Sequence, residues 1–310
     1  MAALTTLAPV LFMIGLGFVS RVKNILSPDQ KEGANKLVFT LLFPLLVFSL
    51  LASAQIERSV LGIVLFLLAA YSVIFIACRR WLVKFFQPYE KIAPYLLVTA
   101  EGGNLALPLY VSIVGPSGNT VLLDIAGMLF CFCVIPVLVA KDAAAKENTK
   151  ELALSILKNP FVLAAVFGIL FNISGGYHLL ESSGWFELYS KVIDMATKGI
   201  VPILLFIVGY NLNFSPSILK PALRIAGVRL LFYVLIILAF FVLFPGQMAD
   251  TAFMMAVFLY FTCPTGFGVV MQLTPLYKDE NDEALASGVI SLNMIVTLLV
   301  YTAIVLWQVH

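Results

Sequence analysis

The chain has 310 residues, of which 61% are hydrophobic and only 12% are charged. Because soluble domains carry about 25% charged residues, this composition excludes a soluble protein and indicates an integral membrane protein. The formal net charge is +2, and no basic patch is interleaved with aromatic residues, which argues against nucleic-acid binding. The four cysteines all lie inside apolar runs, so we predict neither disulfides nor a metal site.

Ten apolar runs are long enough to cross a bilayer, which takes about 20 residues per helix. In chain order they lie near residues 4–21, 36–54, 59–78, 93–114, 118–140, 159–176, 189–211, 222–244, 249–275 and 284–308. The longest polar connection, residues 141–158, falls near the middle of the chain. The sequence therefore predicts an all-α integral membrane protein with ten transmembrane helices, five in residues 1–140 and five in residues 159–310.

Basic residues gather in alternate connections between the predicted helices. Arg79 and Arg80 follow the third helix, and four lysines lie in the connection 141–158. The opposite side carries little more than Arg58 and Lys191. By the positive-inside rule, the connection 141–158 is cytoplasmic and both termini face outside, in a multi-pass membrane protein.

The two halves of the chain contain matching motifs at corresponding places. One is a proline followed by apolar residues and a phenylalanine, and the other is a proline followed at the same spacing by a glycine. The matches are Pro44–Phe48 with Pro202–Phe206, and Pro9 and Gly17 with Pro160 and Gly168. An odd number of spans per half gives the halves opposite orientations, so we predict inverted five-helix repeats, which are typical of secondary transporters.

The fourth and ninth helices are each interrupted by polar or helix-breaking residues. A carboxyl group and a helix break are costly in hydrocarbon and are tolerated where they line a cavity. We expect the two broken helices to cross near the membrane midplane, where half-helix N-termini favour an anionic ligand group. The predicted substrate-binding residues are Glu101, Gly102, Gly103, Asn104, Thr262, Pro264, Thr265 and Gly266.

A second group of polar side chains is a candidate for ion coupling. Asp124 lies within the fifth helix, where its alternative role is a hydrogen bond between helices. Asp194 and Lys198 have the spacing of a local ion pair, although Lys198 is alternatively a partner that neutralises Glu101. The tenth helix, where small polar residues also serve packing, contributes Ser287, Ser291 and Asn293.

Several of these motifs resemble the auxin efflux carrier (PIN-like) family. The stretch Gly102–Gly115, with its Ala-Leu-Pro-Leu core, resembles the fourth helix of that family. The stretches Cys263–Gly266 and Ala286–Ile290 resemble its ninth and tenth helices, and Pro44 and Pro202 also fit. The chain departs from the family at Glu101, where an asparagine is usual, and in its short central connection and apolar third helix. These departures make auxin itself a poor substrate prediction.

The resemblance implies a scaffold domain of helices 1, 2, 6 and 7 and a transport domain of helices 3–5 and 8–10. It also implies elevator-like movement, carboxylate substrates, the plasma (inner) membrane, and a homodimer through the scaffold. We therefore predict a secondary active transporter for a small organic anion, with proton coupling through Glu101. Sodium coupling, uncoupled transport and a channel are the alternatives.

We predict no enzyme activity and no cofactor, because motifs such as H-E-x-x-H, G-x-S-x-G and a phosphate-binding loop are missing.

Overall fold

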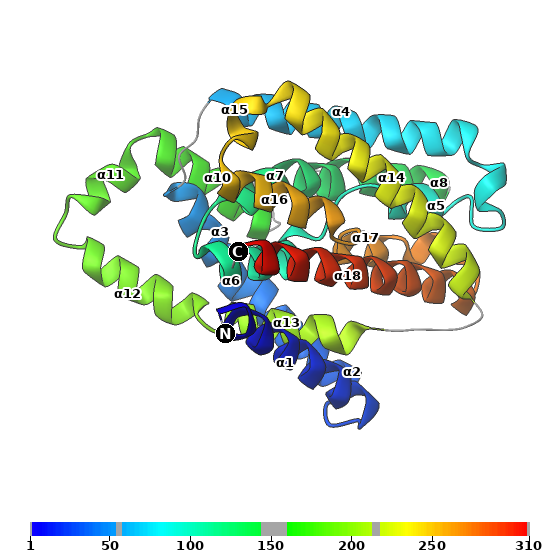
Figure 1. Cartoon of the computed structure of the whole chain (residues 1–310), viewed down its shortest axis with the longest axis horizontal. Coiled ribbons are helices and arrows are strands. Elements are labelled where there is room, and N and C mark those ends of the chain that lie inside the picture. The colour runs from blue at the N-terminus through cyan, green and yellow to red at the C-terminus, as the bar shows by residue number, and fades with distance from the viewer. Residues whose placement is uncertain (1, 54–57, 144–159, 213–217, 309–310) are drawn as a thin grey trace.

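The computed structural model describes residues 2–53, 58–143, 160–212 and 218–308. Within these ranges every regular element is a helix (Figure 1). By length and composition, five of the described helical stretches can span a membrane: Pro28–Ala52, Leu61–Trp81, Phe186–Tyr210, Leu219–Leu243 and Asn281–Gln308. Most of the predicted cytoplasmic connection, residues 141–158, lies outside the described residues.

Prolines begin many of the helical segments in the first half. Pro94 lies in the first turn of a helix, where the missing N–H is not needed. Pro44, Pro108 and Pro136 each lie just after a π-helical turn, where the missing N–H of proline interrupts the regular hydrogen-bond pattern of the helix. The elements are α1 (Ala2–Val22), α2 (Pro28–Leu37), η1 (Val38–Leu42), α3 (Phe43–Ala52), α4 (Arg58–Trp81), η2 (Lys84–Phe86), α5 (Ala93–Leu96), η3 (Gly102–Ala106), α6 (Leu107–Val114), α7 (Asn119–Leu129), η4 (Phe130–Val134) and α8 (Ile135–Asp142). Of these, η1, η3 and η4 are single π-helical turns, which frequently occur at functional sites.

The second half contains longer uninterrupted helices. Its elements are α10 (Pro160–Ile173), α11 (Gly176–Glu181), α12 (Phe186–Thr197), α13 (Ile200–Asn211), α14 (Leu219–Leu243), α15 (Pro245–Met248), α16 (Thr251–Thr262), α17 (Phe267–Gln272), η6 (Thr274–Leu276) and α18 (Glu280–Gln308). Asp250 caps α16, because its side chain accepts a hydrogen bond of 3.0 Å from the backbone N–H of Ala252.

Both predicted helix breaks are present. The fourth predicted helix consists of α5 and then η3 and α6, with residues 97–101 between them. The ninth consists of α16 and α17, with residues 263–266 between them. The sequence pattern therefore located the two interruptions correctly.

Some predicted boundaries are wrong. The second helix begins at Pro28 rather than near residue 36, because Ser27 and Gln30 form a reciprocal capping box. The seventh predicted helix begins at Phe186 rather than near residue 189 and is divided into α12 and α13. Pro202 explains the division, since it has no N–H to donate to the carbonyl of Lys198.

Glycines allow two pairs of helices to pack with their backbones in contact. Helix α1 packs on α13, and α3 packs on α10. A Cβ at Gly17 would overlap the carbonyl of Phe206, and a Cβ at Gly168 would lie 2.9 Å from the carbonyl oxygen of Phe48. We call α1–α3 and α10–α13 the scaffold side; in Figure 1, α10–α12 form a limb at its left.

The remaining helices, α4–α8 and α14–α18, form the main body (Figure 1), and its large buried apolar core also takes in Val10 and Ile14 of α1 and Leu205 and Val208 of α13. A smaller apolar cluster joins the main body to the scaffold side. We call it the interface cluster, and it consists of Val38, Phe43, Val47, Leu50, Leu51, Leu107, Val121, Leu122, Ala164, Ile200 and Leu204. Gly102 and Gly103, directly after the first helix break, lie at this boundary, because they line a cavity together with Phe43 and Val47 of α3. The assignment of these two groups as separate domains stays a prediction.

Candidate functional site

The two helix breaks touch through their backbones. The N–H of Glu101 donates a hydrogen bond of 2.8 Å to the carbonyl of Pro264. Thr99 has a φ of 58°, a left-handed conformation that costs a β-branched residue about 1–3 kcal/mol. Two breaks that are distant in sequence therefore form one strained, buried structure.

Threonines supply partners for the carbonyls that the breaks leave free. The hydroxyl of Thr265 donates to the carbonyl of Val98 over 2.8 Å and lies 3.4 Å from the hydroxyl of Thr99. The carbonyl of Thr262 accepts a bond of 2.8 Å from the hydroxyl of Thr297 on α18. In this conformation the hydroxyl of Thr265 supports the break, and its predicted contact with substrate stays a prediction.

Two carboxyl groups lie where the two breaks meet. Glu101 is only 6% exposed, and a Cβ at Gly266 would lie 3.9 Å from its Oε2 atom. Asp124 on α7 accepts a hydrogen bond of 2.9 Å from the hydroxyl of Tyr260 on α16. The carboxyl of Asp124 also occupies the space that a Cβ at Gly102 would need. Asp124 therefore lies against Gly102, the residue that follows Glu101 in the chain.

A small cavity adjoins Asp124 at the boundary between the scaffold side and the main body. Its water-accessible space is about 10 Å³, enough for roughly one water molecule. The hydroxyl of Thr120 is 1% exposed and has no hydrogen-bond partner among the described residues. The cavity is lined by Phe43, Val47, Gly102, Gly103, Leu107, Thr120, Val121, Asp124 and Met128.

The main functional candidate that the sequence analysis missed is Arg229 on α14. It is 1% exposed and donates to carbonyls of both breaks: from Nη1 to Leu96 (3.2 Å) and Val98 (3.4 Å), and from Nη2 to Thr99 (2.6 Å) and Cys263 (3.0 Å). Its guanidinium carbon lies 4.1 Å from the ring centroid of Tyr233, whose hydroxyl also donates to Thr99 over 2.5 Å. The signal was available, because an arginine well inside an apolar span is a functional candidate by default.

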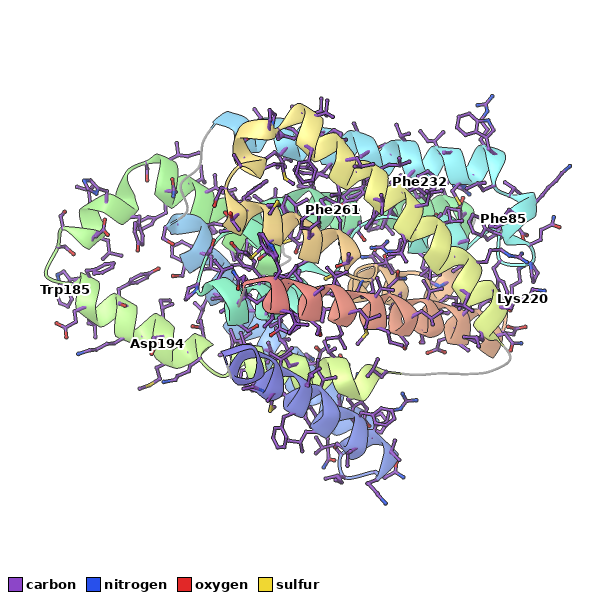
Figure 2. All side chains as sticks on the ribbon, in the orientation of Figure 1. Phe85, Trp185, Asp194, Lys220, Phe232 and Phe261 are labelled. Carbon is purple, nitrogen blue, oxygen red and sulfur yellow. The ribbon has the colours of Figure 1, made fainter. Side chains whose placement is uncertain are left out.

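The remaining predicted residues are placed less centrally. Asp194 and Lys198 are exposed on the scaffold side, and Figure 2 shows Asp194 on the limb, away from the main body. Among the described residues Lys191 pairs with Glu187 at 2.6 Å, and no ion pair joins Asp194 to Lys198. The structure therefore does not bring Lys198 to the buried Glu101.

The polar residues of α18 bond mainly along their own helix. Ser291 donates to the carbonyl of Ser287, and Asn293 donates to the carbonyl of Val289, each over 2.9 Å. Asn104 belongs to the π-helical turn η3, but its side chain lies outside the described part of the structure. The polar centre of the site is therefore formed by the two breaks, the two acids and Arg229.

Comparison with known protein families assigns the chain to a family. No curated protein matches the chain. The family of membrane transport proteins matches residues 2–305, almost the whole length, and confirms the resemblance carried by the fourth, ninth and tenth predicted helices. The chain is therefore a multi-pass membrane protein that belongs to the membrane transport protein family, which includes the auxin efflux carriers.

Proposed function

We propose that this protein is a secondary active transporter that moves a small organic anion across the plasma (inner) membrane together with protons. The observation that carries the proposal is the pair of carboxyl groups, the buried Glu101 and the half-buried Asp124, beside two helix breaks that touch. Family membership supplies the general activity, membrane transport. The anion, the protons and the mechanism are the parts that we propose.

The proposed architecture is ten spans in two inverted repeats. Gly17 of the first predicted helix meets the backbone of Phe206, the last residue of the proline motif in the seventh. Its counterpart in the repeat, Gly168, meets the backbone of Phe48, the last residue of the matching motif in the second helix. A two-fold relation between the halves predicts this exchange of partners, so the contacts support the proposed repeat.

The proposed movement is a displacement of the main body along the scaffold side. The interface cluster is apolar on both sides, and apolar burial is non-directional, so such a boundary tolerates sliding better than a hydrogen-bonded one. The cavity beside Asp124 has room for about one water. A substrate larger than water therefore fits beside Asp124 only if the two parts move relative to each other.

Proton coupling follows from the charges around the crossing point. Two like charges about 4 Å apart repel by about 4 kcal/mol at an effective dielectric constant near 20. An organic anion that binds beside Glu101 and Asp124 is therefore favoured when these carboxyl groups are protonated. Because linkage is reciprocal, proton binding then promotes anion binding and anion binding promotes proton uptake, which is the basis of symport.

The test is uptake of labelled carboxylates, chosen by a thermal-shift screen, into liposomes that contain the purified protein. We expect an inward proton gradient to accelerate uptake and a protonophore to abolish that acceleration. Glu101→Gln and Asp124→Asn preserve size and remove the titratable group, so each should greatly weaken the response to the gradient. Asp194→Asn is the matched control, because Asp194 is exposed on the limb, and it should behave as wild type.

Two outcomes would contradict the proposal. Wild-type rates and wild-type pH dependence in both Glu101→Gln and Asp124→Asn would rule out coupling through these acids. An ohmic single-channel current through the purified protein in planar bilayers would favour the channel alternative over alternating access.

A further inference from the structure

The buried guanidinium of Arg229 occupies a cage of backbone carbonyls that belongs to both helix breaks. Three of the carbonyls belong to Leu96, the last residue of α5, and to Val98 and Thr99, which follow it. The fourth, that of Cys263, stands at the C-terminal end of α16. No single helix could supply this set of acceptors, because the cage exists only where the two breaks cross.

Such a cage favours a cation. Carbonyls released by a helix break are costly at membrane depth unless they find partners, and the C-terminal end of a helix carries partial negative charge. In transporters with discontinuous helices, unwound carbonyls and half-helix C-termini coordinate the coupling sodium ion or proton. Here the carbonyls already have a positively charged partner that is covalently part of the chain.

The chemistry of the cage matches a guanidinium group better than an ammonium group or a metal ion. The two terminal nitrogens of an arginine carry four N–H donors in one plane, and here each nitrogen donates to two carbonyls. The face of the group rests on the ring of Tyr233 at 4.1 Å, a cation–π arrangement that favours the planar ion. An ammonium has three donors and no flat face.

We infer that Arg229 is a fixed internal cation that takes the place of a coupling metal ion at the helix crossing, so that the protein folds and transports without sodium. This inference deepens the proposed function, because it assigns coupling to the acids and a positioning role to Arg229. The effects of sodium and of methylguanidinium on the thermal unfolding midpoint are nevertheless measurable on the purified protein without any substrate. Failure of the proton-coupling test would therefore leave this inference standing, and the reverse also holds.

The first experiment uses the wild-type protein. Its thermal unfolding midpoint is measured in detergent with equal concentrations of sodium, potassium or N-methylglucamine chloride, and uptake is measured in the same three salts. We expect the midpoint and the uptake rate to be the same in all three. A saturable, sodium-specific rise of the midpoint or an uptake rate that depends on sodium would overturn the inference.

The second experiment removes the internal cation. Arg229→Ala should lower the unfolding midpoint by several degrees, and low concentrations of methylguanidinium should restore part of that loss saturably. Arg229→Lys should also be less stable than wild type, because three donors cannot serve four carbonyls. Arg224→Ala is the matched control: Arg224 lies on the same helix, donates to the carbonyl of Phe85 over 2.7 Å and stacks on its ring, but outside the cage.

In the Arg224→Ala control and in wild type, methylguanidinium should give no stabilisation. If Arg229→Ala is as stable as wild type, or is stabilised by methylguanidinium no more than the control, the inference is wrong. Should Arg229→Ala fail to fold, the sodium comparison on wild type and Arg229→Lys still decides the question. Sodium-specific stabilisation of either protein would then contradict it.

Discussion

At the scale of single residues, the site depends on glycines, which have no side chain, as much as on its polar residues. The carboxyl of Asp124 fills the space in which a Cβ of Gly102 would stand, and the hydroxyl of Tyr260 lies 2.6 Å from the position of a Cβ at Gly127. These two glycines allow α7, α16 and η3 to approach until Tyr260 and Asp124 form their hydrogen bond. The half-buried carboxyl of Asp124 is thus held against the backbone of Gly102, directly after the first helix break.

Gly102→Ala is therefore expected to damage the site more than its size suggests. The added methyl group must displace the Asp124 carboxyl, and overpacking of this kind typically costs about 1–3 kcal/mol. The measurement is thermal unfolding together with uptake, and both should fall. Gly227→Ala on α14 is the control, because nothing lies within 4 Å of its Cβ position; equal effects of the two changes would show that the contact with Asp124 is unimportant.

Two of the site residues were predictable from the sequence, because each is an ionisable side chain inside an apolar segment. Glu101 and Asp124 stand out because a carboxyl group is costly inside an apolar run, and the structure places both beside the helix breaks. Arg229 is also a charged residue inside an apolar segment, but its partners are backbone carbonyls at the ends of two other helices. Sequence patterns describe side chains, so they do not reveal a cage that consists of main-chain oxygens.

At the scale of elements, the breaks are held by two continuous helices that pack behind them. Helix α14 runs from the end marked by Lys220 past Phe232 (Figure 2) and holds both breaks through Arg229. Helix α18 holds the second break through Thr297, whose hydroxyl donates to the carbonyl of Thr262. We therefore expect α14, α18 and both breaks to move as one unit.

The contribution of α18 can be isolated with an isosteric change. Thr297→Val keeps the shape of the side chain but leaves the buried carbonyl of Thr262 without this donor, which should cost about 1–3 kcal/mol. The unfolding midpoint should fall, with a loss of uptake. Thr302→Val is the matched control, since the Thr302 hydroxyl donates to the carbonyl of Leu298 within its own helix and should cost little. A midpoint for Thr297→Val that matches this control would refute the role of the contact.

The elements themselves were partly predictable. The interruptions near Glu101 and Pro264 follow from residues that disfavour a continuous helix. The start of the second helix at Pro28 was missed because its first turns are polar and exposed, although the capping residues Ser27 and Gln30 were present in the sequence. An apolar run in the sequence therefore predicts only the membrane-spanning part of a helix and not the polar turns that precede it.

At the scale of the whole molecule, two groups of helices meet across the interface cluster. Within the scaffold side, helices approach to backbone contact at Gly17 and Gly168. Across the interface cluster, by contrast, contact is made by bulky apolar side chains such as Phe43, Leu107 and Val121. The first kind of contact resists relative movement, because even one methyl group would not fit. The second kind allows the main body to slide as a unit while each part keeps its own packing.

This division predicts which cross-links will stop transport. Val47 on α3 and Val121 on α7 line the same cavity from opposite sides of the boundary. Val47→Cys with Val121→Cys, joined by a short bifunctional thiol reagent in liposomes, should lose most uptake and regain it when the link is reduced. Ser49→Cys with Tyr189→Cys is the control, because these side chains bond at 3.2 Å within the scaffold side, and its cross-link should leave uptake intact. Full uptake by the cross-linked Val47–Val121 pair would exclude sliding at this boundary, whereas loss of uptake in the control would show that the scaffold side itself must change shape.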